Sequence, residues 1–297
     1  MIVVDWGTSS FRAYRLDAGG GVAERREGPH GILAVADGDF GGVLATVVGD
    51  WLAAEPGDLW LAGMIGSRQG WVEAPYAACP AGPAEIAAAV RAIDWQGRRL
   101  NFVPGLSCRE ADGAHDVLRG EEVQILGVMA AIGAAPATVV LPGTHSKWAR
   151  VAAGRVHGFR THMTGEAFAV MRRHSILGRT MPEGAEANDA AAFARGLARA
   201  TTGGGLLSHL FSVRTAALFD EVAPAALPSL LSGILIGHEL AAALAEAPDG
   251  PVHVVAGPAL ARLYADALAA FGRRAEIHDP DAAARGLHAL ATMTAGA

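Results

Sequence analysis

The feature that most constrains the fold is a segment that occurs twice in the chain. Residues Ile2 to Ala13, IVVDWGTSSFRA, align without a gap with Thr138 to Ala149, TVVLPGTHSKWA. Each copy reads as a short apolar strand, a Gly-Thr turn and a further strand, and a Gly-containing turn and another strand follow. Because the copies lie almost half of the 297 residues apart, they predict a duplicated domain and not a solenoid, whose repeats are shorter. The alternative is that two common strand-turn segments match by chance.

The apolar pattern around the two copies predicts a mixed α/β chain. After the first copy the expected elements are helices at 40–53, 84–93 and 118–132 and strands at 59–64 and 100–103. The polar stretch 105–115 is interpreted as a loop. After the second copy the chain is expected to be mostly helical, with two further strands at 252–255 and 275–278. The boundary between the two lobes is expected near residues 133–136.

Each Gly-Thr turn is suited to bind an anion. A glycine lets the backbone approach a ligand closely, successive N–H groups form a concavity, and Thr and Ser hydroxyls add donors. Two such turns, facing each other across a cleft, could hold a triphosphate. The candidate residues are Gly7, Thr8, Ser9, Ser10, Gly143, Thr144, His145, Ser146 and Lys147.

The two copies differ at the end of the first strand. Asp5 stands there in the first copy and Leu141 in the second. We expect Asp5 to hold the water shell of a Mg²⁺ ion, since Mg²⁺ prefers few carboxylates and many waters; an Asp that caps its own turn is the alternative. Lys147, the single lysine of the chain, could offset charge on a transferring phosphoryl group.

Asp116 is the candidate catalytic base. It is expected at the start of the helix that precedes the second repeat copy, where the helix dipole keeps a carboxylate ionised. Asp is also a favoured N-cap of any helix, which is the alternative. Glu121 and Glu122 follow closely; one of them could assist with metal or substrate, although exposed helical glutamates are the more common explanation.

The composition argues against several classes of protein. A formal net charge of −6 does not favour a nucleic-acid binder, which needs a basic face. Cys79 and Cys108 are too few for a disulfide framework, and the N-terminus MIVVDWG does not read as a signal peptide, so a cytoplasmic protein is expected. The apolar segments 123–132 and 230–236 are expected to be buried helices, not membrane spans.

Three motifs resemble those of the sugar kinase, heat-shock chaperone and actin superfamily. Asp5-Trp-Gly-Thr-Ser-Ser resembles the first phosphate motif and Leu141-Pro-Gly-Thr-His-Ser-Lys-Trp the second. Val254-Val-Ala-Gly-Pro-Ala-Leu resembles the adenosine motif, in which Gly257 leads a helix that packs on the nucleoside.

This resemblance implies a duplicated actin-like, ribonuclease H-like ATPase fold with ATP and Mg²⁺ as cofactors. Its two lobes, residues 1–134 and 135–297, would each contain a mixed five-stranded sheet flanked by helices, with a cleft between the lobes. The last helix could pack back on the N-terminal lobe. In such sugar kinases the catalytic Asp begins the helix before the second phosphate motif, which is the place expected for Asp116.

Further motifs are similar to those of the 2-dehydro-3-deoxygalactonokinases. They are Ala62-Gly-Met-Ile-Gly-Ser-Arg-Gln-Gly-Trp, Glu73-Ala-Pro-Tyr, Asp116-Val-Leu-Arg-Gly-Glu-Glu, Pro142-Gly-Thr-His-Ser-Lys-Trp and Met163-Thr-Gly-Glu. Leu118 stands where Met is expected, a conservative departure. The resemblance covers nearly the whole chain and implies that ATP phosphorylates the 6-hydroxyl of 2-dehydro-3-deoxy-D-galactonate, in galactonate catabolism.

A keto-deoxy sugar acid would require groups for a carboxylate and for hydroxyls. Ser67, Arg68 and Gln69 could supply them, although Arg68 could instead be a solvated charge or part of an ion pair between the lobes. Trp71 and Tyr76 could wall the pocket or anchor their loop to the core. Glu166 could contact the substrate or merely begin a helix. His145 and His162 are expected near the cleft, more as hydrogen-bonding groups than as ligands, and no zinc-site spacing is present.

Two other functions remain compatible with the sequence. One is a kinase for another keto-deoxy acid, such as the gluconate epimer, and the other is a non-catalytic module of the same fold that responds to sugar or nucleotide. The expected partners are the sugar acid and ATP, with no nucleic acid and no membrane, and a homodimer is one assembly that the sequence allows.

Overall fold

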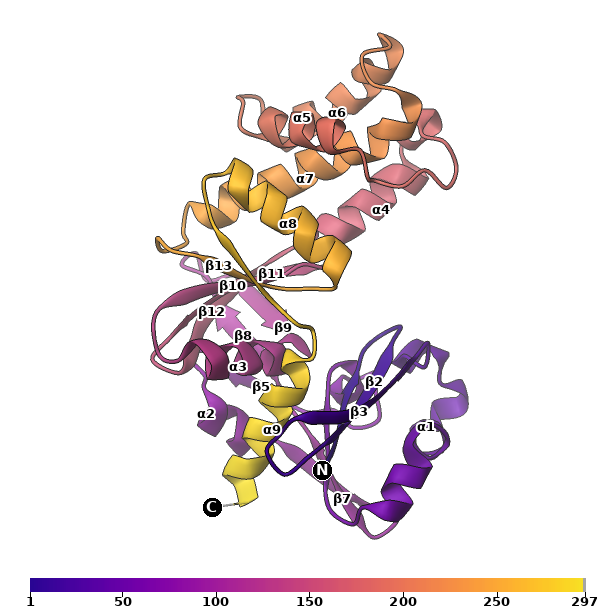
Figure 1. The fold of residues 1–297 in the computed structure, drawn as a ribbon, viewed down its shortest axis with the longest axis vertical. Coiled ribbons are helices and arrows are strands. Elements are labelled where there is room, and N and C mark those ends of the chain that lie inside the picture. Colours follow the sequence, from indigo (N-terminus) through magenta and orange to yellow (C-terminus); the bar gives the residue numbers. More distant parts are fainter. Residues whose placement is uncertain (296–297) are drawn as a thin grey trace. The chain divides into compact units, whose positions relative to one another are not determined.

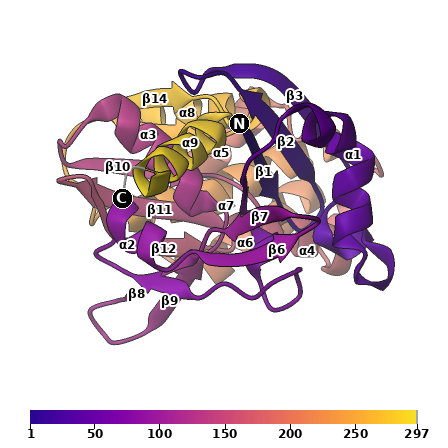
Figure 2. The same cartoon turned by 90° about the horizontal axis from the view of Figure 1, so that it is seen from below.

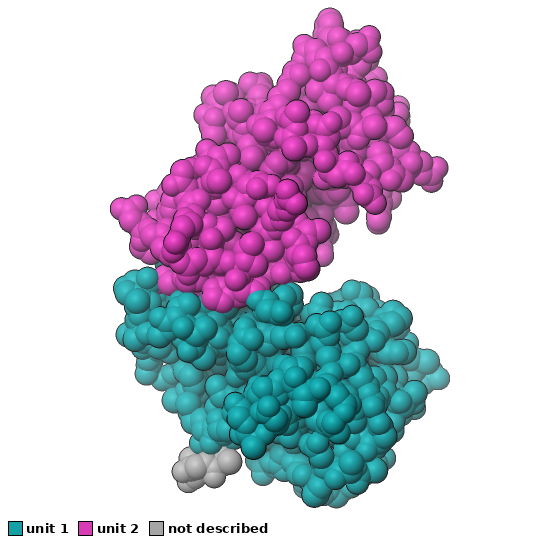
Figure 3. All heavy atoms as spheres, viewed as in Figure 1, with its two compact units in different colours: residues 1–136, 149–159, 279–297 teal, residues 137–148, 160–278 magenta. Residues whose placement is uncertain are grey.

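The computed structural model describes residues 1–295 and divides into two compact units. Of the described residues, unit 1 comprises 1–136, 149–159 and 279–295, and unit 2 comprises 137–148 and 160–278 (Figure 3). The C-terminal segment therefore belongs with the N-terminal part of the chain.

A six-stranded mixed sheet forms the centre of unit 1. Its strands, in the order in which they pair, are β3 (Val22–Gly28), β2 (Phe11–Leu16), β1 (Ile2–Trp6), β4 (Leu59–Ala62), β7 (Arg98–Phe102) and β6 (Arg91–Trp95). The first three form an antiparallel meander, whereas β4 is parallel to β1 and β7 is parallel to β4. β1 and β4 are buried along their whole length, as expected for apolar strands in the middle of a covered sheet.

This sheet has one strand more than the five predicted. Residues 91–95, expected at the end of a helix over 84–93, form β6, which pairs antiparallel with β7. Gln96 and Gly97 join the two strands with φ angles of 50° and 75°, the left-handed pair that a two-residue hairpin favours. The helix α2 (Pro83–Ala88) accordingly ends before this hairpin.

The second sheet repeats the order of the first. Its strands are β12 (Arg155–His162), β11 (Ser146–Ala152), β10 (Ala137–Leu141), β13 (Val252–Val255) and β14 (Ala275–His278). β13 is parallel to β10 and β14 is parallel to β13, as β4 and β7 follow β1 in the first sheet. The duplicated α/β fold predicted from the two repeat copies is therefore confirmed.

A three-stranded sheet was not predicted. It pairs β5 (Tyr76–Ala78) in parallel with β8 (Gly105–Arg109), which pairs antiparallel with β9 (His115–Leu118). The interpretation of residues 105–115 as a loop is therefore wrong, because most of this stretch forms the β8–β9 hairpin. The first residues of β8 are buried, which stabilises it as a strand in spite of its polar surroundings.

The described residues of unit 1 also form helices. They are α1 (Phe40–Ala54), α2, α3 (Glu121–Ile132) and α9 (Ala282–Ala295), with short 3-10 helices η1 (Ile32–Ala34), η2 (Ala36–Gly38) and η3 (Met64–Gly66). α9 lies beside α3 and also contacts β1 (Figures 1 and 2). The α3–α9 crossing is very close, because Gly127 of α3 and Gly286 of α9 each face the backbone of the other helix.

Unit 2 is mostly helical after β12. Its helices are α4 (Thr164–His174), α5 (Ala190–Ala200), α6 (Gly205–Leu218), α7 (Leu227–Leu244) and α8 (Pro258–Ala270), with η4 (Gly178–Thr180) and η5 (Pro224–Ala226). The segment Pro224–Leu244 is long and apolar enough to cross a membrane, but 72% of its most apolar window is buried in the fold, as in the core helix of a globular protein. The prediction of a buried helix at 230–236 is confirmed.

Candidate functional site

The first Gly-Thr turn lies between β1 and β2. The N–H of Gly7 donates to the carbonyl of Ser10 at 2.8 Å, which closes the turn, while Thr8 and Ser9 are exposed. Gly31 packs so closely on this turn that a Cβ atom there would lie 2.3 Å from the Ser9 backbone. The turn is thus held from behind and presents its two hydroxyl side chains to solvent.

Asp5 precedes this turn and is only 8% exposed. Its neighbour across the β1–β2 pair is Arg12, whose Nη1 donates to the Asp5 carboxylate at 3.3 Å. Burial raises the pKa of Asp5 to about 6, and the Glu121 charge contributes to the rise, whereas Arg12 lowers the pKa. The desolvation cost exceeds the benefit of this single ion pair, so the carboxylate would gain from a further positive charge.

Two glycines bring three segments together beside Asp5. Gly63, with a φ angle of 94°, follows β4, and a Cβ atom there would lie 2.6 Å from the Trp6 carbonyl oxygen and 3.3 Å from an Asp5 carboxylate oxygen. Gly120, with a φ angle of 103°, precedes α3, and its Cβ would lie 3.1 Å from the Gly63 Cα. The carboxyl ends of β1 and β4 therefore meet the first turn of α3.

The first turn of α3 contains two glutamates with different environments. Glu121 is partly exposed, and its carboxylate accepts a hydrogen bond from the Arg119 N–H at 3.1 Å. Glu122 is completely buried; its Oε2 accepts from the Gly120 N–H at 2.6 Å, and its Oε1 has no hydrogen-bond partner in the described part of the chain. Burial raises the pKa of Glu122 to about 8. The expectation that both are exposed helical glutamates is wrong for Glu122.

Asp116 does not begin α3, so the predicted position is wrong. It lies in β9, opposite Cys108 of β8, and its carboxylate accepts the N–H of Val117 at 2.7 Å. The helix cannot extend back to Asp116, because Gly120 has a left-handed φ angle that interrupts it. Burial, and in addition the charge of Asp116, raise the pKa of the Cys108 thiol.

The predicted substrate loop, residues 67–76, follows η3. Ser67 Oγ accepts the Gln69 N–H at 3.3 Å, and Arg68, with a side chain 87% exposed, lies 3.5 Å from Glu73. Arg68 is thus a solvated loop charge in this structure. Beyond Arg68, aromatic residues anchor the loop.

Trp71 anchors this loop to the core. Its ring stacks on Phe40 and makes edge contacts with Trp95 and Phe102, which supports the alternative that it anchors the loop and does not wall a pocket. Tyr76 lies under the Arg119 guanidinium, at 4.5 Å from the ring centroid.

The second Gly-Thr turn lies between β10 and β11 in unit 2. The start of α4 closes on it, because the Glu166 N–H donates to the Thr144 carbonyl at 3.0 Å and the Glu166 carboxylate lies 2.5 Å from His145 Nε2. Lys147 is buried, and its Nζ donates to the His145 carbonyl at 3.0 Å. The structure therefore brings the predicted residues 143–147 and Glu166 together.

Glu239 of α7 supports this turn and was not predicted. Its carboxylate accepts hydrogen bonds from Trp148 Nε1 at 2.7 Å, from the Tyr264 hydroxyl at 2.8 Å and from the Thr164 hydroxyl. The Tyr264 hydroxyl also lies 3.1 Å from Ser146 Oγ. Burial raises the pKa of Glu239. The sequence signal was an acid within an otherwise apolar helix, which needs partners when it is buried.

Gly257 lies between β13 and α8, as its motif predicted. It has extended backbone angles at the N-cap of α8, and a Cβ atom at this position would meet nothing within 4 Å. The absence of a side chain leaves open space above the first turn of α8. This is compatible with a flat ligand that packs there.

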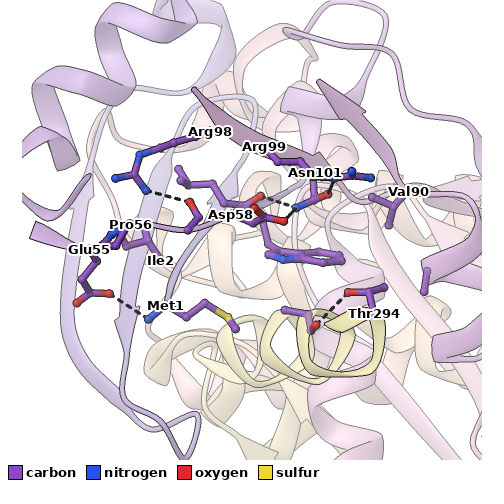
Figure 4. A pocket seen from close by; sticks show the side chains of 15 residues that line it. Met1, Ile2, Glu55, Pro56, Asp58, Val90, Arg98, Arg99, Asn101 and Thr294 are labelled. Atoms are coloured by element: carbon purple, nitrogen blue, oxygen red, sulfur yellow. Dashed lines mark hydrogen bonds and ion pairs between the residues drawn. The ribbon is translucent and has the colours of Figure 1, made fainter. Parts of the chain in front are cut away.

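A cavity of ≈ 710 Å³ in unit 1 lies at the other end of the first sheet (Figure 4). It is lined by the amino ends of β1, β4 and β7, whereas Asp5 lies near the carboxyl end of β1 and the first turn follows that end. Its polar groups bind one another: Arg98 donates to the Gly57 carbonyl at 2.9 Å, and Arg99 Nε donates to Asn101 Oδ1 at 3.2 Å. The candidate site is therefore not in this cavity.

Comparison with known proteins gives consistent matches. A family model described as 2-keto-3-deoxy-galactonokinase matches residues 5–290. Relatives assigned as 2-dehydro-3-deoxygalactonokinases come from Rhizobium meliloti (strain 1021), 42% identical over 97% of this chain and 95% of the relative, and Escherichia coli (strain K12), 35% identical over 91% and 90%. A solved structure from Sinorhizobium meliloti, assigned to the same activity, has a TM-score of 0.89 and 39% identity over 99% of this chain and 98% of that chain.

Proposed function

Because the chain belongs to the 2-keto-3-deoxy-galactonokinase family, we propose that its substrate is 2-dehydro-3-deoxy-D-galactonate and that ATP phosphorylates the 6-hydroxyl. The chain is a phosphotransferase with an alcohol acceptor, and its fold is the mixed α/β, actin-like fold found in ATPases and sugar kinases. The observation that carries the proposal is the match over residues 5–290, which contains both Gly-Thr turns and the loop after β4. The proposed role is in galactonate catabolism, and the proposed location is the cytoplasm.

The two turns are proposed to bind the phosphates of ATP. Residues 7–10 and 143–146 offer backbone N–H groups and hydroxyls, which suit phosphate oxygens. Lys147 would offset charge on the phosphoryl group as it is transferred. Gly257 would leave room for the nucleoside at the start of α8.

Asp5 fits the magnesium ion that such a transfer uses. In residues 1–295 no group of three or more His, Cys, Asp or Glu side chains could hold a metal ion, which agrees with an ion held mainly by water and phosphate oxygens. Asp5 is buried and its charge is incompletely compensated by Arg12, so a cation nearby would stabilise its ionised form. The ion would neutralise charge on the nucleotide phosphates.

Candidate groups for the sugar acid are proposed in each unit by itself, in the loop after β4 of unit 1 and at the start of α4 of unit 2. Ser67, Arg68, Gln69 and Tyr76 are the candidates from the loop, and Glu166 is the candidate from α4. The high exposure of Arg68 leaves its guanidinium accessible to a ligand carboxylate. Trp71 contributes indirectly, because it fixes the loop to the aromatic core.

The proposed substrate can be tested with the purified full-length chain. ADP formation from ATP and Mg²⁺ is expected to depend on 2-dehydro-3-deoxygalactonate, with the phosphate on the 6-oxygen as shown by phosphorus NMR of the product. The gluconate epimer, which differs at one carbon, is the matched control. A kcat/KM for the epimer equal to or above that for the galactonate compound would overturn the substrate assignment.

The acid limb of the pH profile is expected to report Asp5. Its pKa of about 6 predicts that kcat/KM falls roughly tenfold per pH unit below this value, because the protonated carboxyl no longer attracts the metal ion. Since Arg12 lowers the pKa of Asp5, the Arg12→Ala variant should move the limb to higher pH. Protonation of ATP affects both pH profiles equally, so a difference between the two profiles reports only on ionisable groups of the enzyme. An identical limb in the variant would exclude Asp5 as its source.

A further inference from the structure

The first turn of α3 is the part of unit 1 that brings a second carboxylate to Asp5. Gly120 packs on Gly63, and Gly63 in turn lies against the Asp5 carboxylate. Glu121 follows Gly120 directly, and its charge acts on Asp5. Backbone packing therefore holds Glu121 next to the proposed metal and phosphate site.

The other two acidic candidates do not share these properties. Glu122 is completely buried, and with a pKa of about 8 it retains its proton at neutral pH. Asp116 lies in β9 opposite Cys108 of β8, in the three-stranded sheet and not at the carboxyl ends of β1 and β4. Glu121 is partly exposed, so it alone of the three combines access to solvent-borne ligands with a position beside Asp5.

Two neighbours of Glu121 in the sequence, Arg119 and Glu122, have buried polar atoms without a hydrogen-bond partner among the described residues. Oε1 of the fully buried Glu122 has no hydrogen-bond partner in the described residues, and the same holds for Nε and Nη1 of Arg119. Buried polar atoms without partners are costly and rare in native folds. Two residues close to Glu121 in the sequence therefore carry buried polar atoms that ordered water would have to satisfy.

We propose that Glu121 is the carboxylate that orients the attacking hydroxyl of the sugar acid and accepts its proton. The proposal rests on the kinase function given above. The hydroxyl oxygen would form a bond to the γ-phosphorus of ATP, and the bond from that phosphorus to the bridging oxygen of ADP would break. The hydroxyl proton would pass to a Glu121 carboxylate oxygen and from there to solvent, so no other reactant is required.

Arg119 and Gly120 act as positioning residues in this arrangement. The Arg119 N–H holds the Glu121 carboxylate, and the Arg119 guanidinium donates to the Ala74 carbonyl at 2.8 Å. The loop that carries the proposed substrate residues is thereby tied to the residue that would receive the proton. Binding of the sugar acid and its activation would then depend on the same short segment.

The test compares Glu121→Gln with Glu122→Gln, a matched change one residue away. Glu121→Gln is expected to lower kcat by about a thousandfold, the range of a lost general base, with the KM values for ATP and sugar acid within about threefold. Glu122→Gln should keep kcat within about threefold, because Gln resembles a neutral carboxyl. Unfolding midpoints for both variants, measured by chemical denaturation, show whether either has lost its fold.

The Asp116→Asn variant distinguishes Glu121 from Asp116 as the group that accepts the hydroxyl proton. We expect a loss of less than about tenfold, below the range of a general base. A thousandfold loss in Asp116→Asn with nearly normal Glu121→Gln would return the role to Asp116 and overturn the proposal. If wild-type protein did not phosphorylate the sugar acid, the proposed substrate would fail; equal kcat for wild type and Glu121→Gln on any accepted substrate would reject the Glu121 assignment alone.

Discussion

Gly286→Ala is expected to lower the free energy of unfolding by at least about 2 kcal/mol, as overpacking at a tight contact does. A Cβ atom at Gly286 would lie 1.9 Å from the Val123 carbonyl oxygen and 3.1 Å from the Gly127 N. These are backbone atoms of α3, so no side-chain rotation can relieve the overlap, and α9 would have to move away from α3. The gain of about 1 kcal/mol in helix propensity from Gly to Ala does not offset this loss.

Gly49→Ala is the matched control for this change. Gly49 also lies within a helix, α1, but a Cβ atom there would meet nothing within 4 Å. Urea denaturation should therefore show that Gly49→Ala is neutral or slightly stabilising, whereas Gly286→Ala is destabilised. Equal effects of the two substitutions would mean that the close α3–α9 crossing does not contribute to stability.

The internal repeat predicted the central strands of both sheets, because each of its two copies contains the same sequence of strand, turn and strand. A buried strand, a Gly-Thr turn and a second strand are readable from a few neighbouring residues, and both copies place β1 and β10 at the corresponding position of their sheets. The sequence also distinguishes Asp5, because the second copy has Leu141 in its place, and the role of Asp5 at a metal ion stays a prediction. The strands that the repeat encodes were therefore predicted correctly, whereas the end of the helix expected over 84–93 and the loop expected over 105–115 were not.

Features that depend on tertiary packing were not predicted. Asp116 was placed at a helix start, yet Gly120 adopts a left-handed φ angle because it packs against Gly63, a residue distant in sequence. The β6–β7 hairpin was missed because Gln96-Gly97 is a weaker hairpin signal than Asn-Gly. Glu239 could have been suspected, but its partners Trp148 and Tyr264 are known only once the chain is folded.

Glu122 makes stability depend on pH in a predictable direction. Its pKa is raised from 4.5 to about 8 by burial, so between these values the folded chain holds a proton that the unfolded chain has released. The free energy of unfolding must then fall as pH rises across this window. The free energy of unfolding falls by about 1.36 kcal/mol for each pH unit, so its total loss has an upper limit of about 5 kcal/mol. Above pH 8 to 9 the free energy of unfolding falls no further on account of Glu122.

Glu122→Gln is therefore expected to be more stable than wild type by an amount that grows with pH. The Gln carbonyl can still accept the Gly120 N–H that now binds Glu122, while the amide cannot ionise. Chemical denaturation should give a difference below about 1 kcal/mol at pH 5 and of several kcal/mol at pH 8. All other titrating groups are common to the two proteins and cancel in this difference. Parallel stability curves from pH 5 to pH 8 would mean that Glu122 ionises normally in the folded chain, so that it could no longer be distinguished from Glu121 by its proton.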